Sequence, residues 1–147
     1  MRTGGPPGAV APPCAVAVFV KTPGCSPVKS RLAAVCGEPF ATALYRRCVA
    51  ATASVVRRAV GAGGLSAYWA VAEAEAVTRW HGFPVVEQGT GDLGERMGRV
   101  HTRLVARHGQ AMLIGADTPQ LEVPVLCEAA LTLQGEAPRL VLGPAED

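Results

Sequence analysis

Short apolar runs alternate with longer segments of helical pattern along this chain. The first run, Ala15 to Val20 (AVAVFV), is apolar throughout, which is typical of a strand covered on both faces. Four later segments are also predicted to be strands: 65–72, 85–88, 111–114 and 139–142. Strands that alternate with helices in this way indicate βαβ units. We therefore predict an α/β fold with a parallel, helix-covered sheet.

Five helices are predicted between these strands, and their ends carry recognisable start and stop residues. Pro39 and Pro124 suit first-turn positions, and Asp92 is a candidate N-cap. Gly61 and Gly109 are expected to end the helices that precede them. The predicted helices cover residues 28–36, 39–60, 73–81, 92–108 and 121–133.

The two ends of the chain differ from the segments between them. Residues 1–13 are rich in proline and glycine, and we expect a flexible N-terminal tail there. Residues 14–147 are expected to form one domain. The last predicted strand ends at Gly143 and the chain stops four residues later without a closing helix. We therefore expect this domain to be incomplete at its C-terminus.

Composition narrows the class of protein without revealing its activity. The chain has 147 residues, of which 49% are hydrophobic, and this describes one globular domain rather than a disordered protein. Its net charge of +2 gives no electrostatic reason to expect a nucleic-acid partner. The longest uncharged stretch, Thr3 to Val20, is broken by prolines, so we expect neither a membrane span nor a signal peptide. A cytoplasmic protein is the interpretation that this favours.

The five cysteines do not indicate a metal site. They are Cys14, Cys25, Cys36, Cys48 and Cys127, an odd number without a C-x-x-C pair or zinc-like spacing. Reduced cytosolic thiols are the expected state.

The segment GADTP, Gly115 to Pro119, places Asp117 just past the carboxyl end of a predicted strand. Ligands bind at this edge of open α/β sheets, and a carboxylate there can hold a metal bound to phosphates. A simple turn is the alternative. Asp147 also follows a predicted strand, and the two carboxylates could share one Mg²⁺ with substrate phosphates. A disordered terminal residue is the other interpretation of Asp147.

The first predicted strand leads into KTPGCSPVKSRLA, a strand–loop–helix unit that contains Lys21, Lys29 and Arg31. Such a loop can direct backbone N–H groups and cations at phosphate. It is not a P-loop, because Val28 stands where the second glycine of that motif is required. Phosphate binding and a structural loop with surface lysines both stay open at this point.

A glycine-rich segment, QGTGDLGERM, follows the strand predicted at 85–88 and opens a helix. Gly89, Gly91 and Gly94 permit tight backbone and close approach of a ligand. It is not a dinucleotide-binding motif, because no acidic residue lies at the expected distance after a strand. Arg96 could face either solvent or a ligand.

Together these segments resemble a bacterial family of GT-A-type glycosyltransferase-like proteins, known as selenodomain-associated or arsenosugar-biosynthesis glycosyltransferases and long described as a domain of unknown function. Residues 21–32 match its motif K-x-P-x-x-G/S-x-V-K-T-R-L, with Ser30 in place of threonine. Residues 88–97 match Q-G-x-G-x-L-G-E-R-M, and residues 114–121 match I-G-x-D-x-P-x-L. Residues 142–147 match the start of L-G-P-A-x-D-G-G-Y.

The resemblance implies a three-layer α/β/α fold of the nucleotide-diphospho-sugar transferase type, which cofactor guanylyltransferases share. It implies that Lys21, Lys29 and Arg31 hold a diphosphate, and that Asp117 and Asp147 bind Mg²⁺ or Mn²⁺. Lys29 and Asp117 would be the catalytic residues. The same resemblance assigns the nucleotide pocket to the glycine-rich segment, through Gln88, Gly91, Asp92, Leu93, Gly94 and Arg96.

Three functions fit this resemblance. The first is a Mg²⁺-dependent transfer of sugar from a nucleotide-sugar to a small-molecule acceptor. The second is a nucleotidyltransferase that consumes an NTP and releases pyrophosphate. The third is an inactive fragment or a nucleotide-binding module. The sequence leaves the base, the sugar, the acceptor and the oligomeric state open.

Overall fold

A computed structural model describes residues 13–135, 137 and 139–143. Four parallel strands form one sheet in the order β3-β2-β1-β4. They are β1 (Cys14–Val20), β2 (Leu65–Val71), β3 (Val85–Glu87) and β4 (Ala111–Gly115). The apolar strand β1 is central and pairs with both β2 and β4, which explains why it carries no alternating polar residues. The tail predicted at residues 1–13 lies outside the described residues, apart from Pro13.

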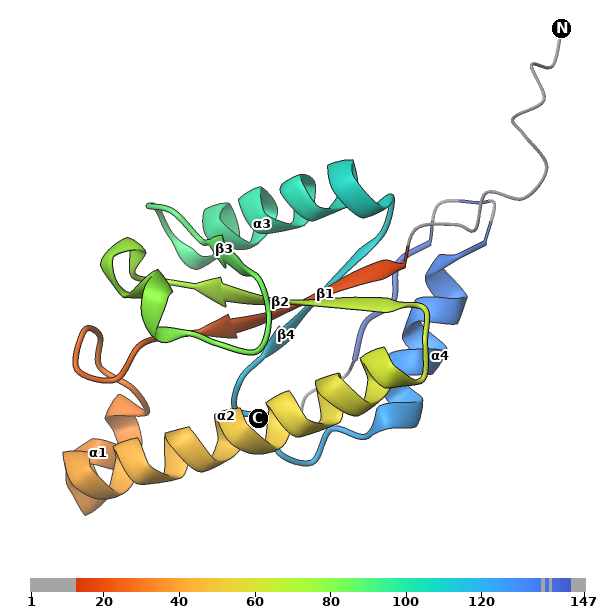
Figure 1. The fold of residues 1–147 in the computed structure, drawn as a ribbon. Helices are drawn as coiled ribbons and strands as arrows, with labels where there is room; N and C mark the ends of the chain where they lie inside the picture. Colours follow the sequence, from red (N-terminus) through yellow and green to blue (C-terminus); the bar gives the residue numbers. More distant parts are fainter. Residues whose placement is uncertain (1–12, 136, 138, 144–147) are drawn as a thin grey trace, which may run out of the picture.

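Helices cover both faces of the sheet (Figure 1). In Figure 1, α3 (Leu93–His108) lies above the sheet, and α2 (Glu38–Gly61) and α4 (Val123–Leu133) lie below it. The short helix α1 (Ser30–Cys36) packs against α2, and a 3-10 helix, η1 (Ala74–Arg79), connects β2 to β3. The predicted three-layer α/β/α fold with a parallel sheet is therefore confirmed.

The core consists of two apolar clusters, one on each face of the sheet. Alternate residues of β1 contribute to them, because successive side chains of a strand point to opposite faces. Val16 and Val18 pack with Val56 of α2, whereas Ala15 and Ala17 pack with residues of α3. All five cysteines are unpaired thiols, in agreement with the sequence analysis. No described helix is both long enough and apolar enough to cross a membrane.

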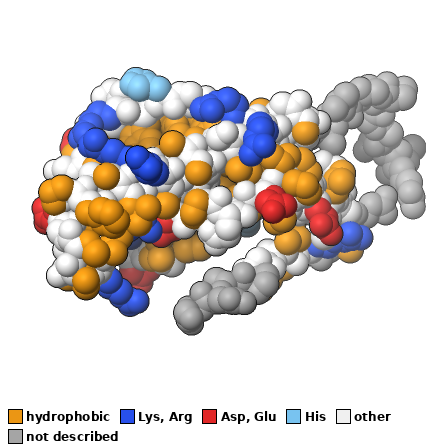
Figure 2. Space-filling view, turned by 90° about the horizontal axis from the view of Figure 1, so that it is seen from below, with side chains coloured by type: hydrophobic (Ala, Val, Ile, Leu, Met, Phe, Trp, Pro, Cys, Tyr) orange, Lys and Arg blue, Asp and Glu red, His pale blue; other side chains and the backbone are white. Residues whose placement is uncertain are grey.

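The outer face of the α2–α4 side carries apolar patches among polar and basic side chains (Figure 2). The large apolar residues left exposed on α1, α2 and α4 are Val35, Phe40, Leu44, Val125 and Leu131.

Helix α3 begins within the glycine-rich segment, and its first turn is capped by side chains. The Asp92 carboxylate accepts a hydrogen bond from the Glu95 N–H at 2.9 Å, and the Glu95 carboxylate accepts one from the Asp92 N–H at 2.8 Å. This capping box satisfies two N–H groups at the helix start that lack partners within the helix. The predicted N-cap at Asp92 is confirmed.

Replacing Asp92 with alanine is expected to lower the free energy of unfolding by about 1 kcal/mol, because the helix loses its cap. Urea denaturation followed by circular dichroism measures the change. Asp92→Asn is the control, since its side-chain oxygen can still accept the Glu95 N–H. Equal losses in both variants would show that charge rather than capping is responsible.

Two predicted elements differ in the structure. Residues 139–142, predicted as a fifth strand, form no strand, and Leu140 and Leu142 are 81% and 79% exposed. An apolar run becomes a strand only where a neighbouring strand offers hydrogen-bonding partners, and none of the described strands pairs with it. The helix predicted at 73–81 is the 3-10 helix η1, closed by i→i+3 bonds such as Ala76 N–H to Glu73 C=O.

Candidate functional site

The predicted site residues follow three different strands, and these strands end at the same edge of the sheet. Lys21 directly follows β1, Gln88 directly follows β3, and Asp117 lies two residues after β4. Because all four strands are parallel, their carboxyl ends face the same way. This is the edge at which open α/β sheets bind ligands.

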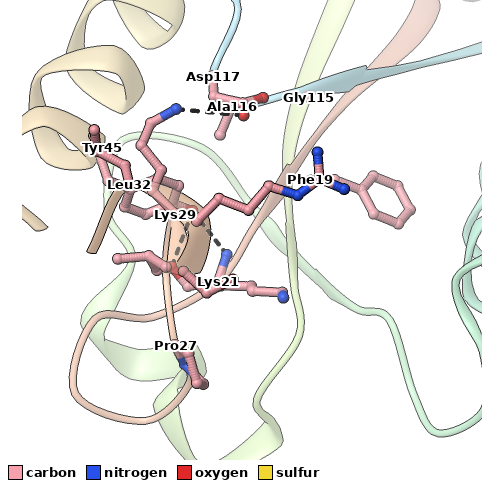
Figure 3. Close-up of a pocket in the computed structure, with 12 residues that line it drawn as sticks. Phe19, Lys21, Pro27, Lys29, Leu32, Tyr45, Gly115, Ala116 and Asp117 are labelled. Atoms are coloured by element: carbon pink, nitrogen blue, oxygen red, sulfur yellow. Dashed lines mark hydrogen bonds and ion pairs between the residues drawn. The ribbon is translucent and has the colours of Figure 1, made fainter. Parts of the chain in front are cut away.

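A pocket of about 510 Å³ lies between the β1–α1 loop and the end of β4 (Figure 3). Its charged residues are Lys21, Lys29, Arg31 and Asp117, so three cations face one carboxylate. Phe19 and Tyr45 contribute apolar and aromatic surface. The excess of positive charge in a concave site favours an anionic ligand.

Lys29 and Asp117 are the closest charged pair in this pocket. The Lys29 Nζ lies 3.6 Å from Asp117 Oδ2, and Figure 3 shows the contact as a dashed line. The Lys29 side chain is 22% exposed and that of Asp117 is 59% exposed. An ion pair this open to water contributes little to stability. Both groups are therefore available to a ligand at small energetic cost.

The backbone of Lys29 is itself unusual. Its φ of +46° makes it the one non-glycine residue in the left-handed region among the residues that the structure describes. This conformation costs a residue with a Cβ roughly 1–2 kcal/mol. Backbone strain of this kind is concentrated at functional sites.

Helix α2 fixes both sides of the pocket. The Tyr45 hydroxyl accepts a hydrogen bond from the Lys21 N–H at 2.9 Å and donates one to the Lys21 C=O at 3.0 Å. Burial raises the pKa of Tyr45 to about 12, so the hydroxyl keeps its proton at neutral pH. Two turns further along α2, the Thr52 hydroxyl donates to the Ala116 C=O at 3.2 Å. The backbone on either side of the charged pair is thus held by one helix.

Gln88 links the glycine-rich segment to the same edge. Its side-chain amide is 3% exposed and donates to the Ala70 C=O at 2.8 Å and to the Val20 C=O at 3.3 Å. Its side-chain oxygen accepts from Arg96 Nη1 at 3.0 Å. Gln88 therefore joins the ends of β1 and β2 to α3, and both polar atoms of its side chain have partners within the protein.

The turn that follows Gln88 requires glycine at two positions. Gly89 and Gly91 have φ values of +76° and +106°. A Cβ on Gly89 would lie 2.6 Å from Arg99 Nη1, and one on Gly91 would collide with the Glu95 carboxylate. Positive φ disfavours larger residues at both positions, and a Cβ would also force the Arg99 or Glu95 side chain to move.

Residues 45–147 match a family described as uncharacterized proteins conserved in bacteria (DUF2064). The chain belongs to this family. A solved structure is also similar to this DUF2064 protein: that of a "putative nucleotide-diphospho-sugar transferase" from Desulfovibrio desulfuricans G20. The two are 26% identical with a TM-score of 0.70, over 82% of this chain and 54% of the other. The chain thus spans about half the length of that protein. A search of curated proteins found no match.

The other predicted site residues of this DUF2064 chain lie outside the 510 Å³ pocket or outside the described residues. Gly91, Asp92, Leu93, Gly94 and Arg96 do not line the pocket. They lie in and after the turn that Gln88 connects to β1. Asp147 is outside the described residues. Nucleotide and metal binding by these residues stay predictions.

The part of the chain that the structure describes contains no group of three or more histidine, cysteine or acidic residues placed to hold a metal. Asp117 is the acidic residue that lines the pocket. A single carboxylate fits Mg²⁺ better than it fits zinc, since Mg²⁺ is often held by one or two carboxylates together with substrate phosphates and water.

Sequence reasoning missed four residues that shape this DUF2064 site: Thr22, Tyr45, Glu73 and Arg99. Glu73 follows β2 much as Asp117 follows β4, and that position was a usable signal. Arg99 lies two residues beyond the glycine-rich motif, and its Nη1 donates to the Gln88 C=O at 2.6 Å. Tyr45 lies on α2, and its contact with Lys21 depends on packing that no local pattern reveals.

Proposed function

We propose that this DUF2064 protein is a divalent-metal-dependent enzyme of the glycosyltransferase type, which binds a nucleotide-sugar and transfers the sugar to a small-molecule acceptor. The observation that carries the proposal is the grouping of Lys21, Lys29, Arg31 and Asp117 in one pocket at the ligand-binding edge of the sheet. The similarity to the Desulfovibrio desulfuricans protein supports the same class of reaction.

In this proposal the three cations hold the diphosphate of the nucleotide-sugar. Lys29 turns from Asp117 to a phosphate oxygen, a change that costs little because the ion pair is exposed. The Tyr45 hydroxyl is hydrogen-bonded to the backbone of Lys21 and so fixes the point at which the Lys21 side chain leaves the sheet. Most of the catalytic effect would come from positioning and from electrostatic stabilisation of the leaving diphosphate.

Asp117 is the proposed ligand of Mg²⁺ or Mn²⁺, and Asp147 is proposed to complete the site. When bound, the metal would supply positive charge to the phosphate oxygens as the sugar departs. The preference for these ions rests on the hard oxygen donor of Asp117 and on the open position beside it, where phosphate and water can complete the coordination.

Nucleotidyl transfer is the alternative reaction for the same pocket. In that reaction an acceptor phosphate attacks the α-phosphorus of an NTP and pyrophosphate leaves. In sugar transfer an acceptor hydroxyl attacks the anomeric carbon and an NDP leaves. The released product therefore separates the two, and binding without turnover would identify a nucleotide-binding module. As part of the sugar-transfer proposal, we also propose that the protein is one of the selenodomain-associated or arsenosugar-biosynthesis glycosyltransferases.

A thermal-shift panel with Mg²⁺ or Mn²⁺ tests the proposal, using NDP-sugars, NTPs and nucleosides as ligands. A ligand that binds only the native state raises Tm, by an amount that grows with its concentration over Kd. We expect a metal-dependent rise with NDP-sugars and little rise with nucleosides. A rise that is equal with and without metal, or none from a cooperatively folded sample, would contradict it.

A further inference from the structure

Thr22 lies near the start of the loop that follows β1 and makes several of the hydrogen bonds that hold this loop. The residue is 2% exposed, and all of its polar groups have partners. Its C=O accepts from Cys25 N–H at 3.0 Å and from Ser26 N–H at 3.1 Å, and its hydroxyl accepts from the Trp80 indole at 2.9 Å. The conformation of the segment between Lys21 and Lys29 therefore depends on how Thr22 is held.

The remaining group of Thr22, its N–H, donates to Glu73 Oε2 at 2.9 Å. Glu73 lies just after β2, the strand beside β1, and is 8% exposed. Its other oxygen, Oε1, is buried without a partner of hydrogen-bonding geometry among the described residues. One carboxylate oxygen of Glu73 thus holds the backbone of the loop, and the other is enclosed beside it, so the carboxylate is committed to the loop rather than to solvent.

The charge state of Glu73 makes this contact strong. Burial favours the neutral acid, but the Ser26 hydroxyl lies close enough to favour the charged form, as does the Thr22 N–H, and together they lower the pKa of Glu73 below its ordinary value of 4.5. The carboxylate is therefore ionised at neutral pH. Hydrogen bonds to an ionised group contribute about twice as much as bonds between neutral groups.

We propose that Glu73 is the positioning residue of the phosphate-binding loop: its buried carboxylate holds the Thr22 N–H and thereby places Lys21 and Lys29 for a diphosphate. This inference rests on the proposed function and extends it to a residue outside the pocket. Glu73 touches no ligand in this arrangement. It acts from β2, while Tyr45 holds Lys21 from α2, so the loop is fixed from two elements.

A purely structural role for Glu73 would lower stability without changing which ligands bind. A positioning role changes the affinity for phosphate groups selectively. The test is therefore isothermal titration with Mg²⁺-pyrophosphate, a probe that needs no base or sugar, together with amide hydrogen exchange at Thr22. We expect Glu73→Ala to weaken pyrophosphate binding by about tenfold or more, the value of a hydrogen bond to a charged group. Exchange of the Thr22 amide should accelerate in the same variant.

Three variants serve as controls. Glu73→Gln keeps an oxygen that can accept the Thr22 N–H but loses the charge, so it should restore part of the affinity and keep the fold if alanine does not. Glu75→Gln removes the same charge from an exposed residue of η1 and should bind as the wild type does. Val56→Ala lowers stability from the core and should leave pyrophosphate affinity unchanged in the folded protein.

The outcomes separate the two proposals. Wild-type protein that binds pyrophosphate and a Glu73→Ala variant that binds it equally would overturn the role of Glu73 alone. Wild-type protein that binds neither pyrophosphate nor NDP-sugars would overturn the phosphate site, and the role of Glu73 with it. A Val56→Ala variant that loses affinity as Glu73→Ala does would show that the effect is general destabilisation, which also overturns the inference.

Discussion

Asp117→Asn is expected to abolish the metal-dependent part of nucleotide binding and to leave the fold intact. The carboxylate is exposed and pairs with Lys29 rather than with the core, so its loss costs little stability. An amide is a neutral and weaker ligand for Mg²⁺. We expect at least about a 100-fold loss in metal affinity, since even the outer-shell partners of metal ligands contribute roughly 10- to 100-fold. Titration of Mn²⁺ into the protein with a bound nucleoside diphosphate measures it.

Glu128→Gln is the matched control for this experiment. It removes one negative charge from an exposed position on α4 and should leave the metal titration unchanged. Urea denaturation of both variants checks that they fold. Metal-dependent binding that survives in Asp117→Asn would remove Asp117 from the metal site and leave the cations of the pocket as its only supported binding groups.

Lys29→Ala is expected to weaken binding of nucleoside diphosphates by about 10- to 100-fold, while binding of nucleosides stays the same. The ammonium group lies in the pocket beside Asp117, where a phosphate oxygen could take the place of the carboxylate. A nucleoside has no phosphate and does not use this contact. Parallel titrations with a nucleoside and its diphosphate give the ratio directly.

The left-handed backbone of Lys29 supplies an informative second variant. Lys29→Gly removes the ammonium group and relieves the strain of φ +46°, so this variant should be more stable by up to about 1 kcal/mol and yet bind diphosphate as poorly as Lys29→Ala. Lys29→Arg keeps the charge and should retain part of the affinity. Equal losses for nucleoside and diphosphate would count against a role in phosphate binding.

The fold was largely predictable because its main signals are local. The apolar run of β1 and the helix limits at Asp92 and Gly109 depend on residues close in sequence, and the structure confirms them. The segment 139–142 also carries apolar residues, Leu140 to Leu142, but strand formation needs a partner strand as well. A local pattern does not report whether that partner is present.

The site residues that follow strands could be predicted from the sequence. The residues that hold those site residues in place could not. Lys21 and Asp117 could be placed from the parallel sheet alone, because parallel strands end at one edge. The contacts of Tyr45 with Lys21 and of Glu73 with Thr22 join residues far apart in the chain. They depend on packing between whole elements, which a single sequence does not specify position by position.

The central place of β1 also shapes how this chain folds. Helices α1 and α2 separate β1 from its partner β2. The pairing of Ala15 with Ala111 of β4 spans more of the chain and closes a loop of roughly 100 residues. Pairings of such long range are slow, because the entropy of loop closure is lost before the contacts repay it. The unit made of β1, α2 and β2 is therefore expected to form early, during synthesis. Asp117, carried by the end of β4, would reach Lys29 only after β4 has paired with β1, so the pocket forms later than this unit.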